Sequence, residues 1–274
     1  MKVRVIHITL LLLLATSAAY GEVKVERDVS YGPHQRNVFD IYWKTEYKDA
    51  PIVFTIHGGA FRAGSKAYCN ADMQKLFLDK GCVVVSPNYR LLQKGASSIA
   101  DCAIDCAMAV AWVQANAEKF GGDPTRIVST GGSAGGYLSY VIAYKKKWDW
   151  PADAKYKPEK LNVIGWYGDS AFLTPWVMKY VDTNDPPAFM IYGEREHPAT
   201  PAKLGHEMQK IFKADGIWNR MVYVKKAGHV PGKRVLISSN GRNEAVFDAF
   251  DQFLDMVCYG KEKPNDGDVI TIGN

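Results

Sequence analysis

The chain lacks the sequence features of several common protein classes. It has no Cys-x-x-Cys pair and no group of neighbouring histidines, so a metal site is not expected. Its basic run Lys145–Lys147 is isolated, which argues against nucleic-acid binding. No internal repeat or low-complexity linker divides the 274 residues. This length fits a single large domain.

No apolar run in the chain is long enough to cross a membrane. Ile8–Ala15 is less than half of the roughly 20 residues that a spanning helix needs. Lys2 and Arg4 precede it and small residues follow it, which is the order of a secretory signal peptide. We therefore expect a signal peptide over residues 1–21, cleaved after Ala19 or Gly21, and a secreted or periplasmic protein without a stable membrane span. A retained membrane anchor is the alternative.

Five cysteines are consistent with export to an oxidising compartment. There they can form two disulfides and leave one thiol, or all five can be buried thiols. Cys102 and Cys106 lie four residues apart on one predicted helix, where neighbours bridge poorly. The cysteines are Cys69, Cys82, Cys102, Cys106 and Cys258.

Strands alternate with helices along most of the chain. Predicted strands cover residues 23–29, 37–43, 51–56, 82–86, 126–130, 161–166, 188–192 and 220–224. Predicted helices cover residues 71–80, 97–120, 133–144, 201–215 and 243–258. This order indicates an α/β fold with a mostly parallel sheet covered on both faces, and an antiparallel pair at its start. The domain is expected to span residues 22–260, with residues 261–274 as a C-terminal tail.

Gly131–Gly135 reads Gly-Gly-Ser-Ala-Gly and lies between a predicted strand and a predicted helix. A sharp strand-to-helix turn holds its serine in a strained conformation, so residues two positions away must be small. The helix N-terminus then directs free N–H groups at the reacting centre. Ser133 is therefore predicted to be a nucleophile.

A second glycine-rich segment, His57–Phe61, follows the buried strand at residues 51–56. Its glycines let the backbone approach a substrate carbonyl group. We expect the amides of Gly59 and Ala60, with that of Ala134, to form an oxyanion hole. His57 and Gly58 are expected to support this loop.

Three segments together resemble the carboxylesterases of the hormone-sensitive-lipase and acetyl-esterase group. They are His57–Phe61 with Gly64-Ser65, Asn88–Leu91, and Gly131–Gly136. The resemblance covers roughly residues 35–255. It implies the α/β-hydrolase fold, with a sheet of about eight strands, and hydrolysis of carboxylic esters. One departure is Ala60, where many members have glycine; alanine supplies the same backbone N–H. Another is Glu196, where the family usually has aspartate.

A serine nucleophile needs a general base and an orienting acid, which follow it in this fold in the order acid, then histidine. His229 lies just after the strand at residues 220–224 and is the expected base. The family's acid maps to Glu196. Glu194 in the same turn and Asp169 after an earlier strand are the alternatives. No cofactor is expected, because the triad and the oxyanion hole supply the chemistry.

Only residues 145–160 separate the nucleophile's helix from the next strand, which is too short for a helical lid domain. An open or shallow acyl site is expected, favouring short acyl groups or esters on polysaccharides. Trp148, Trp150 and Trp176 can either stack on sugar rings or pack in the core. The alternative functions are an amidase or formamidase, a small peptidase, or a catalytically inactive binding protein on the same fold.

Overall fold

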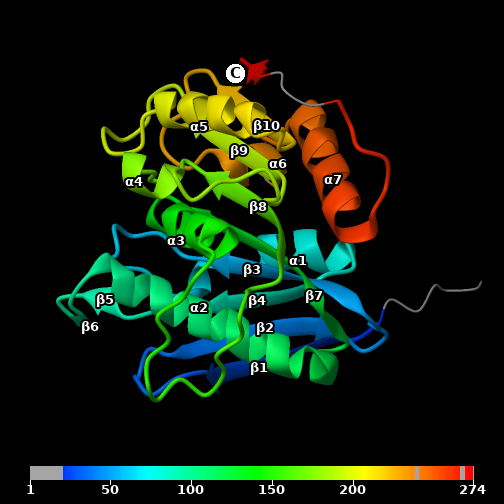
Figure 1. The fold of residues 1–274 in the computed structure, drawn as a ribbon. Helices are drawn as coiled ribbons and strands as arrows, with labels where there is room; N and C mark the ends of the chain where they lie inside the picture. The colour runs from blue at the N-terminus through cyan, green and yellow to red at the C-terminus, as the bar shows by residue number, and fades with distance from the viewer. Residues whose placement is uncertain (1–20, 238–240, 266–268, 274) are drawn as a thin grey trace, which may run out of the picture.

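A nine-stranded sheet runs through the molecule (Figure 1). The computed structural model describes residues 21–237, 241–265 and 269–273, so the predicted signal peptide lies outside the described residues except for Gly21. The sheet order is β1-β2-β4-β3-β7-β8-β9-β10-β11. In chain order its strands are β1 (Val23–Ser30), β2 (Val38–Lys44), β3 (Ala50–Ile56), β4 (Val83–Pro87), β7 (Gly122–Gly132), β8 (Val163–Asp169), β9 (Ala188–Gly193), β10 (Asn219–Val224) and β11 (Val269–Ile272).

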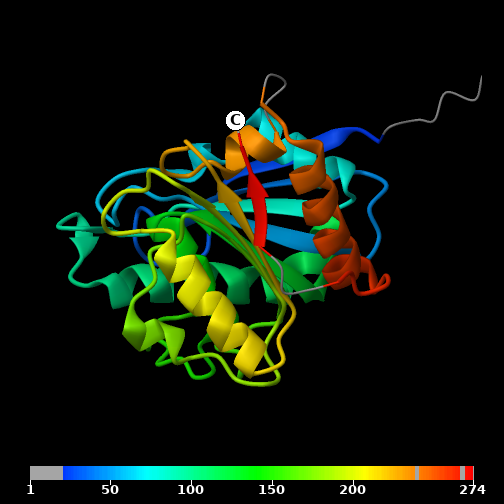
Figure 2. The ribbon, with the colours of Figure 1, turned by 90° about the horizontal axis from the view of Figure 1, so that it is seen from above.

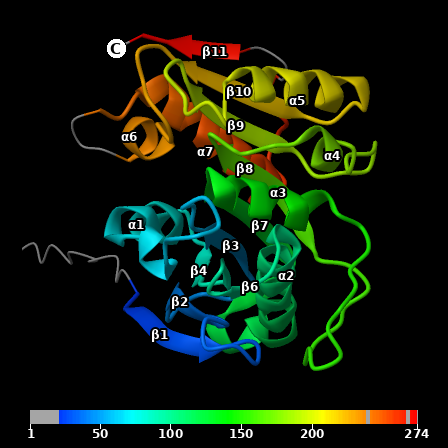
Figure 3. The same cartoon turned by 90° about the vertical axis from the view of Figure 1, so that its left-hand side faces the viewer.

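Helices cover both faces of this sheet (Figures 1 and 2). One face carries α2 (Ile99–Asn116), α3 (Ala134–Tyr144), α4 (Pro175–Met178) and α5 (Lys203–Ala214). The other carries α1 (Ala71–Asp79), α6 (Gly232–Leu236) and α7 (Glu244–Tyr259), which Figure 3 shows on the opposite side from α2. Short pieces complete the chain: β5 (Leu91–Leu92), β6 (Gly95–Ala96) and the 3₁₀ turns Lys66–Tyr68 and Ala117–Phe120.

Strand pairing confirms the predicted α/β-hydrolase arrangement. β1 pairs antiparallel with β2, and β2 antiparallel with β4, while β3, β4 and β7 to β11 are parallel. Every residue of β3 and β4 is buried, as expected for strands covered on both faces. No helix among the described residues is long and apolar enough to cross a membrane.

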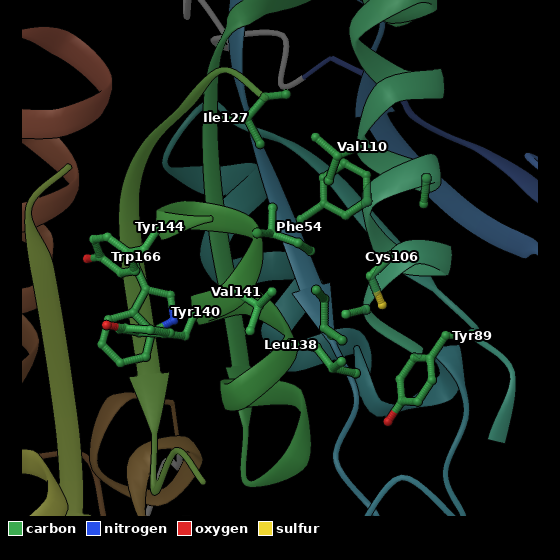
Figure 4. Packing of buried hydrophobic residues seen from close by; sticks show 14 of the residues in the cluster. Phe54, Tyr89, Cys106, Val110, Ile127, Leu138, Tyr140, Val141, Tyr144 and Trp166 are labelled. Atoms are coloured by element: carbon green, nitrogen blue, oxygen red, sulfur yellow. The ribbon is translucent and has the colours of Figure 1, made fainter. Parts of the chain in front are cut away.

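Each face of the sheet has its own hydrophobic core. On the α2–α3 face, Phe54 of β3 and Trp166 of β8 pack with Val110 of α2 and Leu138 of α3 (Figure 4). On the other face, Phe77 of α1 and residues of α7 pack against the sheet. These two cores fix the central strands, so the loops at their carboxyl ends are held in place.

Capping residues set the helix ends that the sequence indicates. Ser98 begins α2 with a reciprocal capping box to Asp101, and Asn243 accepts a hydrogen bond from the amide of Val246 at the start of α7. Gly260 ends α7 in the left-handed conformation at φ +62°.

One element differs from the sequence-based expectations. β11 lies in the expected C-terminal tail and pairs parallel with β10, because Val269, Ile270 and Ile272 cover apolar surface at that edge; the sheet, expected to have about eight strands, has nine. All five cysteines are free and buried, which is the second of the two alternatives given above, and no disulfide is present among the described residues.

Candidate active site

Ser133 lies in a strained turn between β7 and α3. Its backbone has φ +56° and ψ −120°, a conformation that L residues rarely adopt. The Ser133 amide donates to the Asp169 carbonyl oxygen (2.9 Å), and the Ser133 carbonyl accepts from the Phe172 amide (3.1 Å). Backbone contacts to the end of β8 thus hold the turn.

The turn requires glycine on both sides of Ser133. A Cβ atom on Gly135 would lie 2.1 Å from the Ile56 carbonyl oxygen, and one on Gly131 would lie 2.4 Å from the backbone of Gly135. Such separations are far inside van der Waals contact, so a side chain at either position would force the backbone apart. The structure agrees with the requirement for small neighbours that the sequence pattern implies.

The His57–Phe61 loop presents backbone amides beside Ser133. Its turn places Gly59 at φ +101° and Ala60 at φ +52°. Among the described residues, no acceptor is hydrogen-bonded to the amide of Gly59 or Ala60. Ala134 is the first residue of α3, so its amide also lacks an intrahelical partner. These three amides border the same cavity as Ser133 and are available to a developing oxyanion.

His57 contacts this loop and the residue Tyr89 that packs against it. Its ring stacks on Tyr89 with centroids 4.2 Å apart, and Nδ1 lies 2.8 Å from the Gly58 carbonyl oxygen. The Tyr89 hydroxyl donates to the His57 carbonyl oxygen (2.9 Å). Burial lowers the pKa of His57 to about 4, so the ring is neutral near pH 7 and Nδ1 donates.

Glu196 and His229 form a close pair in loops after β9 and β10. The distance from His229 Nδ1 to Glu196 Oε2 is 2.6 Å. The Glu196 side chain is 3% exposed and that of His229 is 32% exposed, so the carboxylate is enclosed and the imidazole reaches the cavity. No hydrogen bond joins Ser133 to His229 among the described residues, although both border one cavity; such contacts commonly tighten around a substrate.

The two alternative acids lie elsewhere. Glu194 is exposed, and its Oε2 accepts the Lys226 amide (2.7 Å). The Asp169 carboxylate is buried and accepts the Gly232 amide at 3.0–3.1 Å. Burial raises the pKa of Asp169 to about 8, so near pH 7 it is mostly protonated. The structure brings only Glu196 of the three into contact with His229.

Comparison with known families adds to this geometry. A family model described as BD-FAE matches residues 39–177, just over half of the 274 residues. The chain belongs to the BD-FAE family. The matched region contains the His57–Phe61 loop and Ser133 but ends before Glu196 and His229.

Curated relatives of this BD-FAE chain include ester hydrolases. It is 35% identical over 144 residues to "Probable carboxylic ester hydrolase LipM" of Mycobacterium tuberculosis, covering 51% of this chain and 32% of that protein. It is 36% identical over 140 residues to "Venom carboxylesterase-6" of Apis mellifera, covering 42% and 24%. The matches thus span a third or less of these relatives.

A solved structure shares the fold. Est2 of Thermogutta terrifontis, described as a thermophilic esterase with propionate bound, superposes with a TM-score of 0.71 at 20% identity. The match covers 88% of this chain and 97% of that one. The likeness identifies the present BD-FAE chain as an α/β-hydrolase fold along most of its length.

The cavity of this BD-FAE protein measures about 780 Å³. Phe61, Tyr68, Phe172 and Val230 supply apolar lining, and His197 lies at the cavity with its ring 6.1 Å from that of His229. No group of three metal-ligating side chains gathers anywhere in the described chain.

Sequence reasoning missed two hydroxyl groups around Glu196. Thr200 Oγ1 donates to Glu196 Oε2 (3.2 Å) and lies 3.1 Å from His229 Nδ1, while Ser170 Oγ donates to Glu196 Oε1 (2.5 Å). Neither residue belongs to a motif; the only signal is the position of Ser170 directly after a buried strand.

Proposed function

We propose that this BD-FAE protein is a secreted serine carboxylesterase that forms an acyl-enzyme on Ser133. The observation that carries the proposal is the contact between Glu196 and His229, 2.6 Å apart. His229 borders one cavity together with the strained Ser133 turn and with Gly59 and Ala60, whose amides have no hydrogen-bonded acceptor among the described residues. The ester-hydrolase names of the curated relatives support the same reaction.

The chemistry follows from the proton positions. The His229 Nδ1–H donates to Glu196, which leaves Nε2 unprotonated and able to accept the Ser133 hydroxyl proton. The Ser133 oxygen then attacks the ester carbonyl carbon, and the amides of Gly59, Ala60 and Ala134 bind the oxyanion. Each such donor is worth roughly 100- to 1000-fold in rate.

Collapse of the tetrahedral intermediate releases the alcohol, which takes its proton from His229 Nε2. Water then attacks the acyl-Ser133 ester with His229 again as base, and the carboxylic acid leaves. The buried Glu196 carboxylate stabilises the imidazolium in both steps.

Short acyl groups and esters on polysaccharides are the proposed substrates. A second cavity, of about 500 Å³, is bordered by Trp148, Trp176 and Tyr137 together with the carboxylates of Asp149 and Asp153. Trp176 is 71% exposed, which is unusual for an indole with a packing role. Indole faces and carboxylates suit the CH faces and hydroxyl groups of a sugar ring.

A substrate panel tests the proposed function. Nitrophenyl acetate and butyrate should be hydrolysed faster than the longer esters, and Ser133→Ala should abolish hydrolysis of all of them. A rate that rises with chain length would contradict the short-acyl proposal. Faster cleavage of aryl amides or formamides than of the matching esters would instead support the amidase alternative.

A second comparison tests the carbohydrate proposal. Trp176→Ala should slow release of acetate from acetylated xylan while leaving nitrophenyl acetate hydrolysis unchanged, because the small ester does not reach the second cavity. Equal rates of acetate release from acetylated xylan by the wild type and by Trp176→Ala would refute the carbohydrate proposal. For export, the mature N-terminus of protein secreted by its own cells should begin at Tyr20 or Glu22.

A further inference from the structure

The end of β8 contacts all three segments that carry the proposed triad. The Asp169 carbonyl oxygen accepts the Ser133 amide, and the Asp169 carboxylate accepts the Gly232 amide, three residues beyond His229. The next residue, Ser170, contacts the Glu196 side chain. β8 lies between β7 and β9, so its last residue, Asp169, contacts the nucleophile's turn, and Ser170 directly after it contacts the acid in the turn after β9.

The Ser170 hydroxyl joins the acid to the backbone of the base. Its oxygen accepts the Val230 amide (2.8 Å), and its hydrogen is donated to Glu196 Oε1 (2.5 Å). The direction of both bonds is fixed, because an amide only donates and a carboxylate accepts. Ser170 is fully buried, so water does not compete for this hydroxyl.

Two backbone conformations show how tightly this link is held. Ser170 has φ +48°, and Val230, directly after His229, has φ +57°. A left-handed backbone is costly for a β-branched residue and persists where surrounding contacts hold it. The hydrogen bond from the Val230 amide to Ser170 is such a contact.

We propose that Ser170 is a positioning residue, which sets the separation and orientation of Glu196 and His229 through this one hydroxyl. The inference rests on the proposed function, since the pair it positions is the proposed acid and base. Glu196 Oε1 also accepts the Gly193 amide (2.8 Å), so the carboxylate is fixed at one oxygen by two donors while the other faces His229. Without the Ser170 hydroxyl, Glu196 Oε1 loses one of its two donors and the Val230 amide loses its acceptor, so the contact between Glu196 Oε2 and His229 Nδ1 is held less firmly.

Two variants remove the Ser170 hydroxyl and differ in their effect on backbone strain. Ser170→Ala keeps the side-chain volume near that of serine, and Ser170→Gly relieves the positive φ, so loss of folding is not common to both. Ser129→Ala is the matched control. Ser129 lies in β7 and is also fully buried, and its hydroxyl donates to the Ser139 carbonyl oxygen (3.0 Å).

The kinetic test separates positioning from general stability. We expect kcat for nitrophenyl acetate to fall roughly 10- to 100-fold in both Ser170 variants, the loss typical of a hydrogen bond to a charged group, with KM within about twofold. Ser129→Ala should keep wild-type kcat even where its melting temperature falls. Wild-type kcat in a folded Ser170→Gly protein would overturn the inference.

A second measurement does not depend on hydrolysis. The imidazole Nδ1–H signal of His229 in proton NMR, assigned by its absence in His229→Gln, reports the hydrogen bond to Glu196. It should be shifted downfield in the wild type and should move upfield or broaden in both Ser170 variants. An unchanged signal would overturn the inference. Absence of hydrolysis by the wild type would overturn only the proposed function and leave the NMR result to decide on Ser170.

Discussion

Replacing Glu196 by glutamine tests the acid–base pair, because the structure dictates how the new amide must lie. Glu196 Oε1 accepts two hydrogen bonds, from the Ser170 hydroxyl and the Gly193 amide. In the Glu196→Gln variant the amide oxygen must take this place, since an NH₂ group there would face two donors. The amide nitrogen then faces His229 Nδ1, where the carboxylate oxygen lies 2.6 Å away in the wild type.

The expected loss follows from that orientation. An amide N–H that donates to Nδ1 holds His229 in the tautomer with the proton on Nε2, which cannot take the Ser133 proton. A wrong tautomer of this kind lowers kcat by about 10⁴-fold in a serine protease. We expect kcat/KM to fall by roughly 10³- to 10⁴-fold with little change in melting temperature.

Steady-state hydrolysis of nitrophenyl acetate near pH 7.5, with circular dichroism to confirm folding, measures this effect. Glu194→Gln is the matched control; Glu194 bonds only a backbone amide in the same turn, so this variant should stay within about threefold of the wild type, since its charge is solvent-exposed. More than a tenth of wild-type kcat/KM in Glu196→Gln, or a 10³-fold loss in Glu194→Gln, would refute the assignment of the acid.

Other predictions concern the packing around the site. Gly135→Ala should lower the free energy of unfolding in urea by about 3 kcal/mol, because its Cβ would meet the Ile56 carbonyl oxygen; wild-type stability would contradict the tight turn. Asp105→Asn should cost about 3 kcal/mol, since it leaves the Arg90 guanidinium without its buried carboxylate, and a loss below about 1 kcal/mol would show that the pair contributes little. Burial raises the pKa of Asp169 to about 8, so between about pH 4 and pH 8 the folded protein holds a proton there that the unfolded chain has released. Folding stability is then lost as pH rises, by about 1.4 kcal/mol per pH unit, and Asp169→Asn should remove this slope. Parallel pH dependences of unfolding for variant and wild type would show that Asp169 is ionised in the fold.

Sequence patterns predicted the central strands and the main helices because their signals are local. Each signal is contained in a few consecutive residues: the buried apolar runs of β3 and β4, and the serine that caps α2. β11 escaped prediction because only four residues form it and its pairing partner, β10, lies about 45 residues away in the chain. The short helices α4 and α6 were missed for the same reason of length.

For the site, motif and fold order predicted Ser133 and His229, and the family resemblance predicted Glu196. The sequence left three candidate acids open, because Glu194 and Glu196 occupy one turn and only tertiary contacts tell them apart. The part played by Ser170 has no sequence signal, since its partners Glu196 and Val230 are 26 and 60 residues away.

Covalent labelling of Ser133 tests the central claim most directly. The wild-type protein, incubated with a fluorophosphonate and analysed by peptide mass spectrometry, should carry one phosphonyl group on the peptide that contains Ser133. Ser133→Ala should carry none, and His229→Gln should react far more slowly because Ser133 loses its base. A folded wild-type protein that stays unlabelled, or labelling that persists in Ser133→Ala, would contradict the account of Ser133 as the activated nucleophile.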